Sequence, residues 1–94
     1  GYRLLGIQTE DLTPGSRVRF NIAADSGALI SELNPQSYLA QIGARSGDVI
    51  RRINEVPIKN SKDFNEAIVK YRHKKSIIVL LQRGDQGYYI TLEL

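Results

Sequence analysis

Alternation of apolar and polar residues predicts most of the extended elements in this chain. Five segments combine β-branched or aromatic residues with period-two spacing or short apolar runs, as half-buried and buried strands do. Turn signals bound them, such as Asn34-Pro35 after the first and Gly84-Asp85-Gln86-Gly87 between the last two. The pattern therefore predicts extended segments over residues 28–33, 48–53, 56–58, 76–83 and 88–94.

Two segments have the spacing of amphipathic helices instead. The longer one runs from Ser61 to Tyr71, and its apolar residues recur at i, i+3, i+4 and i+7, namely Phe64, Ala67, Ile68 and Tyr71. Asn60 has the side chain of an N-cap, which favours a helix start there. A shorter helix is predicted from Ser37 to Ile42, with Gly43 placed to end it.

The first third of the chain is less regular. A short strand begins at Leu5 and runs toward Leu12, where Thr13-Pro14-Gly15 breaks it. From Ser16 to Gly27 the apolar residues Val18, Phe20 and Ile22 alternate with polar ones. That alternation predicts a short strand or an ordered loop.

Taken together, these elements predict one α+β domain over residues 1–94. A few antiparallel strands with two helices closing the open ends form a partly open barrel or sandwich, here of five to six strands. A sheet in so small a fold cannot bury both of its edges. An uncovered edge beside a helix is a ready site for an added strand from another chain.

The amino-acid composition excludes several kinds of functional site. The 94 residues include no cysteine and a single histidine, His73, which excludes a disulfide framework, a thiolate nucleophile and a two-histidine metal cage. No cofactor is predicted. No apolar run approaches the roughly 18 residues that cross a bilayer, so direct membrane insertion is not predicted.

The net charge of +3 is mild, and the densest basic stretch is 70–75, Lys-Tyr-Arg-His-Lys-Lys. One interpretation is a patch for nucleic acid or an anionic membrane. The other is that cations gather at a helix C-terminus, where the helix dipole favours them. No aromatic stacking platform accompanies the charge, so we favour the second interpretation and predict no nucleic-acid partner.

One longer pattern resembles a known family. Residues 40–54, Ala-Gln-Ile-Gly-Ala-Arg-Ser-Gly-Asp-Val-Ile-Arg-Arg-Ile-Asn, are similar to the signature of bacterial-type PDZ domains, in which a short helix and a glycine lead into Gly-Asp-Val-Ile and a strand. Asp48 is expected to bond backbone amides in the turn. The signature's glycine after Asn54 is Glu55 here, which puts the geometry of that turn in question.

The resemblance covers nearly the whole chain in the circularly permuted order of bacterial PDZ domains. Residues 5–14 and 28–33 look most like the HtrA/Deg (DegP-like) trypsin-like serine proteases, with the second PDZ domain the nearer match. Asp25-Ser26-Gly27 has a weak similarity to the sequence around the nucleophilic serine of trypsin-like proteases. The only histidine follows that serine, however, which is opposite to the trypsin-like order, and the chain is too short for the two barrels of such an enzyme. The resemblance therefore implies a non-catalytic domain of a serine protease.

The resemblance also implies a binding site. Leu4, Leu5, Gly6 and Ile7 resemble the family's carboxylate-binding loop, and the strand of Ile7, Gln8, Thr9 and Glu10 would pair with the ligand backbone. Leu5, Ile7 and Ile68 would line the pocket for the ligand's last side chain, while Ser61 and Asn65 would face the residue two before it. Core packing is the alternative role for the three apolar residues.

The implied partners are exposed apolar C-termini of unfolded or regulatory proteins, together with other domains of the same protease. The implied location is periplasmic or otherwise extracytoplasmic. Two alternatives stay open from the sequence. One is a structural module for protease oligomerisation whose groove is unused, and the other is a PDZ domain of a membrane metalloprotease or secretion component.

Overall fold

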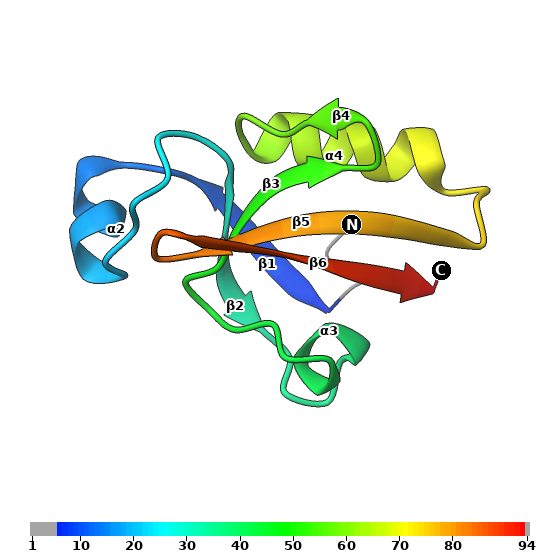
Figure 1. The fold of residues 1–94 in the computed structure, drawn as a ribbon, viewed down its shortest axis with the longest axis horizontal. Coiled ribbons are helices and arrows are strands. Elements are labelled where there is room, and N and C mark those ends of the chain that lie inside the picture. The colour runs from blue at the N-terminus through cyan, green and yellow to red at the C-terminus, as the bar shows by residue number, and fades with distance from the viewer. Residues whose placement is uncertain (1–5, 94) are drawn as a thin grey trace.

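In a computed structural model, which describes residues 6–93, the strands form one antiparallel sheet (Figure 1). The path through the sheet is β1-β2-β3-β5-β6, with β4 pairing to β3 off this path. The fold class predicted from the sequence is confirmed. The strands are β1 (Ile7–Asp11), β2 (Ala28–Leu33), β3 (Val49–Ile53), β4 (Val56–Pro57), β5 (Ser76–Arg83) and β6 (Gln86–Glu93).

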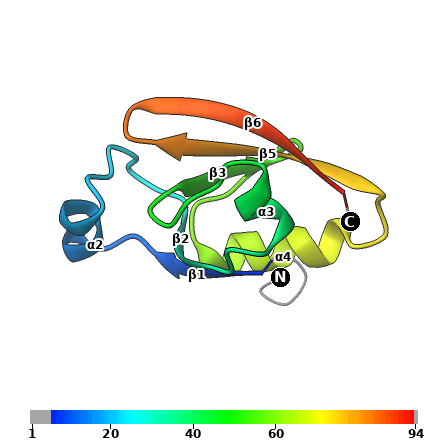
Figure 2. The same cartoon turned by 90° about the horizontal axis from the view of Figure 1, so that it is seen from below.

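Residues 6–93 contain three helices where the sequence predicted two, and these are α2 (Pro14–Arg19), α3 (Tyr38–Gln41) and α4 (Ser61–Tyr71). The sheet curls so that β1 lies along α4 on one side of the molecule while β5 and β6 cover the other (Figure 2). Between these layers lies the main core, which includes the predicted stripe of α4, namely Phe64, Ala67, Ile68 and Tyr71. No helix within the described range 6–93 is long and apolar enough to cross a membrane.

Helix α2 corrects the prediction of a strand or loop after Ser16. Thr13 caps the helix, because its hydroxyl accepts from the Ser16 amide at 3.0 Å while the Ser16 hydroxyl accepts from the Thr13 amide at 2.9 Å. Pro14 stands in the first turn, where its missing N–H costs nothing. Val18 is 83% exposed, whereas Phe20 and Ile22, which follow the helix, pack in a small second cluster, so the alternating residues do not share one strand face.

The turn between β3 and β4 explains how Glu55 replaces the expected glycine. Asn54 takes a positive φ of 52°, while Glu55 does not. Asparagine tolerates the left-handed region, and the second position of this turn needs no glycine. The side chain of Asn54 then accepts from the Ile78 amide at 2.9 Å, which anchors the turn to β5.

The buried carboxylate of Asp48 joins the start of β3 to the β5–β6 hairpin. Its side chain, 1% exposed, accepts from both the Nε and an Nη of Arg83 at 2.8 Å and from the Tyr88 hydroxyl at 2.6 Å. It also accepts from the Arg45 amide at 3.0 Å, so the expected bond to a turn amide is present. Burial, and next the hydrogen bond to Asp48, raise the pKa of Tyr88 above its ordinary value.

Candidate functional site

Strand β1 ends the sheet and has only one strand neighbour, β2, within residues 6–93. The carbonyl of Gly6 accepts from the Asn34 amide at 2.8 Å, and the carbonyl of Gln8 accepts from the Ser31 hydroxyl at 3.1 Å. These carbonyls therefore face β2. Because the groups of successive residues alternate across an antiparallel strand, Ile7 and Thr9 direct their N–H and C=O groups to the open edge.

The irregularity in this ladder does not disturb that alternation. The pairing shifts between Gln8 and Thr9, where Gln8 lies opposite Glu32 and Thr9 lies opposite Ile30. The extra residue, Ser31, belongs to β2. Strand β1 thus stays regular and offers an evenly spaced backbone edge with which no other strand of residues 6–93 pairs.

Gly6 occupies a position that requires glycine. Its φ is +69°, in the left-handed region, and a Cβ built there would stand 2.7 Å from the Cβ of Ser37. Ser37 is fixed in turn because its hydroxyl caps α3 by accepting from the Ala40 amide at 3.2 Å. The chain therefore enters β1 through a sharp turn packed closely on the start of α3.

Helix α4 flanks β1 and is tied to its far end. The carboxylate of Asp11 accepts from the Ser61 amide at 2.8 Å, which satisfies one of the open N–H groups at the helix start. The side chains of Ile7, Thr9 and Asp11 alternate with those of Gln8 and Glu10 and lie on the side of the sheet that α4 covers. Sequence inspection missed Asp11, because a contact across 50 positions leaves no local signal.

The predicted pocket residues fall into two groups. Ile7 and Ile68, 1% and 5% exposed, lie together in the main core, as the core-packing alternative expects. Asn65 is exposed on α4. Ser61 is half-buried, and its hydroxyl oxygen has no hydrogen-bond partner among the described residues. Leu4 and Leu5 lie outside the described residues.

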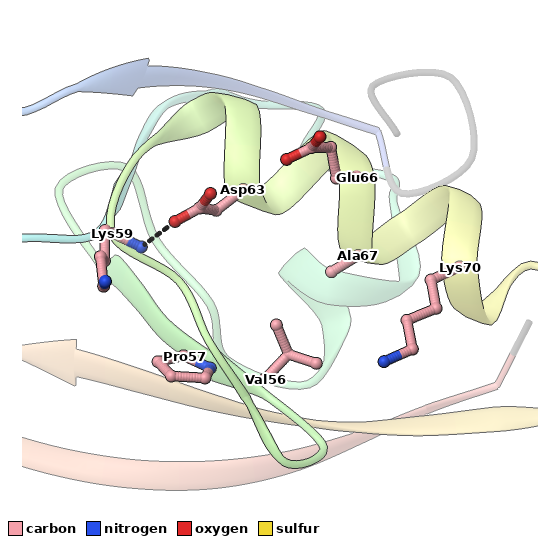
Figure 3. A pocket seen from close by; sticks show the side chains of 7 residues that line it. All are labelled: Val56, Pro57, Lys59, Asp63, Glu66, Ala67 and Lys70. Atoms are coloured by element: carbon pink, nitrogen blue, oxygen red, sulfur yellow. Dashed lines mark hydrogen bonds between the residues drawn. The ribbon is translucent and has the colours of Figure 1, made fainter.

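A separate hollow lies on the other flank of α4, against β4 (Figure 3). Two lysines and two acidic residues line it, and the carboxylate of Asp63 accepts from the backbone amide of Lys59 at 3.0 Å. Its lining is Val56, Pro57, Lys59, Asp63, Glu66, Ala67 and Lys70. The mixed charges and the engaged carboxylate give no converging set of donors or acceptors. The open edge of β1 is the better candidate.

Comparison with known proteins agrees with this geometry. A family model described as PDZ domain matches residues 4–94. The periplasmic serine endoprotease DegP of Salmonella typhimurium is 34% identical over 74 residues, 78% of this chain and 15% of the relative. A probable DegP-like periplasmic serine endoprotease of Brucella suis is 33% identical over 70 residues, 72% of this chain and 14% of the relative. The matched part of the chain thus spans about a seventh of the length of these relatives.

Two solved structures have the same fold. The HtrA-type protease AlgW with a decapeptide superposes with a TM-score of 0.80 at 21% identity, covering 95% of this chain and 27% of that one. The HtrA3 PDZ domain bound to a phage-derived ligand (FGRWV) gives a TM-score of 0.74 at 22% identity, covering 93% and 79%. At such identity the likeness concerns the fold.

Proposed function

The chain belongs to the PDZ domain family, and we propose that it binds the free C-terminal segment of another polypeptide along the open edge of β1. The proposal rests above all on that edge, where Ile7 and Thr9 direct unpaired backbone groups outward beside α4. A peptide added there would continue the sheet, so that backbone hydrogen bonds supply most of the affinity. The two solved relatives with bound peptides support a peptide partner.

The direction of the peptide follows from the turn at Gly6. In this proposal the terminal carboxylate sits at the entry to β1, where Leu4, Leu5, Gly6 and Ile7 would present backbone N–H groups. A left-handed residue next to a strand is the arrangement that turns successive amides toward one anion. With its carboxylate at the start of β1, the peptide must run antiparallel to that strand and point its N-terminal side toward Asp11.

Side-chain selection would come from α4. Ile68 lies toward the carboxylate end, in the same core cluster as Ile7. Both side chains are buried, so an apolar last residue of the ligand would reach them only where the side chains that cover them move aside. The hydroxyl of Ser61 lies near the other end, beside Asp11. Its oxygen is buried and has no partner among the described residues, so the exposed Asn65, one turn further along α4, is the side chain that a polar ligand group would meet first.

In the parent protein, we propose, this domain serves an HtrA/DegP-type serine endoprotease by holding substrates or regulatory peptides. The relatives compared above are serine endoproteases named as periplasmic, which supports an extracytoplasmic location and favours this parent over a metalloprotease or a secretion component. The domain itself is non-catalytic. Catalysis would belong to the part of such proteases that this chain does not cover.

The test is a titration followed by NMR, using pentapeptides with apolar last residues, FGRWV included, each as the free acid and as the C-terminal amide. We expect the free acid to bind with a Kd of about 1–100 μM, because a short peptide buries little area and is ordered on binding. Amidation should weaken binding at least about tenfold, since it removes the carboxylate charge. Shifts should concentrate at residues 6–10 and 61–68.

A backbone variant tests the strand itself. Thr9→Pro removes an N–H that faces the open edge and leaves the β1–β2 ladder intact, so the domain should fold yet bind the free acid at least about tenfold more weakly. Thr9→Val is the matched control and should bind normally. Equal binding of acid and amide, or undiminished binding by a folded Thr9→Pro variant, would overturn the proposed mechanism.

A further inference from the structure

The other end of the sheet, β6, has a second open edge with a defined set of outward groups. Ile78 of β5 uses both of its backbone groups toward β3, because its carbonyl accepts from the Asn54 amide at 2.8 Å and its amide donates to the Asn54 side chain at 2.9 Å. Thr91 lies opposite Ile78. Their pair therefore exchanges no hydrogen bonds, and Thr91 points its backbone groups away from β5.

The remaining outward residues follow from the register. Residues 76–83 pair with residues 86–93 without a bulge, so the alternation holds along the whole strand. Backbone N–H and C=O groups consequently face the open edge at Gly87, Tyr89, Thr91 and Glu93. All four residues are exposed, and no other strand pairs with this edge within residues 6–93.

Strand β6 lacks the features that normally keep an open edge from pairing. Its sequence, Gln-Gly-Tyr-Tyr-Ile-Thr-Leu-Glu, contains no lysine, arginine or proline, and its single charge is at Glu93. Eight residues make it as long as β5 and longer than β1. Natural edges are usually short, bulged or guarded by charge or proline, so an open strand of this kind is suited to pairing with another.

We propose that β6 pairs with β6 of a second copy of this chain, antiparallel about a two-fold axis at Ile90. In that register Tyr89 lies opposite Thr91 of the second copy, and Gly87 lies opposite Glu93. Every outward backbone group of these four residues then finds a partner. The register also places each Glu93 across from a glycine, so the one charge of the strand never faces its like.

The same register accounts for two large apolar side chains on the outer face of the sheet. Tyr89 is 68% exposed and Ile78 is 49% exposed. Across the joined strands, Ile78, Thr91, the second copy's Tyr89 and its Leu80 form one row, because Ile78 pairs with Thr91 and Leu80 pairs with Tyr89 within each copy. Each tyrosine ring would cover Thr91 and reach toward Ile78 of the other copy, which shields apolar surface from water.

Such a dimer would leave β1 open, since β1 and β6 are opposite ends of the sheet. Self-association through β6 is therefore independent of peptide binding through β1, and the inference goes beyond the proposed function. A two-fold interface of this kind is self-complementary, as closed dimers require. The interface is small, so association should be weak, with a Kd of about 0.1–1 mM.

Sedimentation equilibrium from about 10 μM to about 1 mM tests the proposal. The mass should rise from 10.5 kDa toward twice that value. Thr91→Pro removes only an N–H at the open edge and should weaken association at least about tenfold. Thr9→Pro is the matched control on the edge of β1. It should dimerise as wild type does but bind peptide more weakly, whereas Thr91→Pro should bind peptide as wild type does but dimerise more weakly.

A second variant keeps the test valid if Thr91→Pro fails to fold. Tyr89→Lys places a charge on the exposed outer face and should also weaken the dimer, without disturbing the β5–β6 ladder. Amide exchange at Tyr89 and Thr91 should slow as the concentration rises. A wild-type chain that stays monomeric to about 1 mM, or a folded Thr91→Pro or Tyr89→Lys variant that dimerises as tightly as wild type, overturns the proposal.

Discussion

Replacing the buried Asp48 by asparagine should destabilise the domain far more than neutralising an acidic residue on its surface. The carboxylate is buried, and one of its oxygens accepts from Arg83, Tyr88 and the Arg45 amide while the other accepts from Arg83 Nε. Asparagine keeps the shape but has a single acceptor oxygen. If that oxygen serves the three-donor side, its NH₂ group meets the Nε–H of Arg83, donor against donor.

The size of the stability loss follows from the hydrogen bonds and the ion pair that Asp48→Asn removes. Hydrogen bonds to a buried charged group contribute about 1.5–3 kcal/mol each, and breaking a fully buried ion pair costs about 3–5 kcal/mol. The side chain of Arg83 is 41% exposed, so water can solvate it once the pair is broken. We therefore expect Asp48→Asn to lower the free energy of unfolding by about 2–3 kcal/mol, below the fully buried limit.

Urea denaturation measures this change, with the slope m unchanged if only stability is affected. For a domain of this size the loss corresponds to a Tm lower by roughly 8–24 °C. Asp85→Asn is the matched control, because it removes the same charge from an exposed turn and should change stability by less than about 0.5 kcal/mol. Equal effects of the two substitutions would refute the reasoning that the Asp48 network joins the hairpin to the rest of the fold.

Two further predictions concern the entry to β1 and the end of α4. Gly6→Ala should lower the free energy of unfolding by about 2 kcal/mol in urea titrations, because its φ is +69° and its Cβ would meet Ser37. Gly15→Ala should not, because its Cβ would make only an ordinary contact of 3.8 Å with the Thr13 hydroxyl oxygen. The Tyr71 hydroxyl, donating to Glu55 at 3.0 Å, is the main cause that lowers the pKa of Glu55 below 4.5. The ionised carboxylate of Glu55 thus stabilises the fold above about pH 4.5, and this contribution is lost as the pH falls through the lowered pKa. Wild type should therefore unfold at a higher urea concentration than Tyr71→Phe near pH 5, and the difference between the two midpoints should shrink toward pH 3.

Regular elements could be predicted from the sequence where side-chain periodicity sets both the element and its buried face. The bounds of α4 and β5 match the expected 61–71 and 76–83, because their apolar stripes pack directly on the core. Helix α2 escaped prediction for the opposite reason. It buries none of its residues, so its sequence has no apolar stripe with helical spacing. Its helical form comes instead from the capping bonds between Thr13 and Ser16 and from Pro14 in the first turn.

The residues of the candidate site also differ in whether the sequence alone could identify them. Gly6 could be singled out from the resemblance of residues 4–7 to the family's loop, and its positive φ and close approach to Ser37 give the physical reason for glycine there. Asp11 could not, because its role depends on α4 returning to β1, which only the tertiary fold decides. The two open edges show the limit most clearly. The sequence predicts strands from Leu5 toward Leu12 and over 88–94, whereas β1 runs over Ile7–Asp11 and β6 over Gln86–Glu93. Which residues face outward depends on the bonds that Gln8 and Ile78 make to the neighbouring elements. Those bonds make Thr9 and Thr91 the positions where proline separates the two edges experimentally.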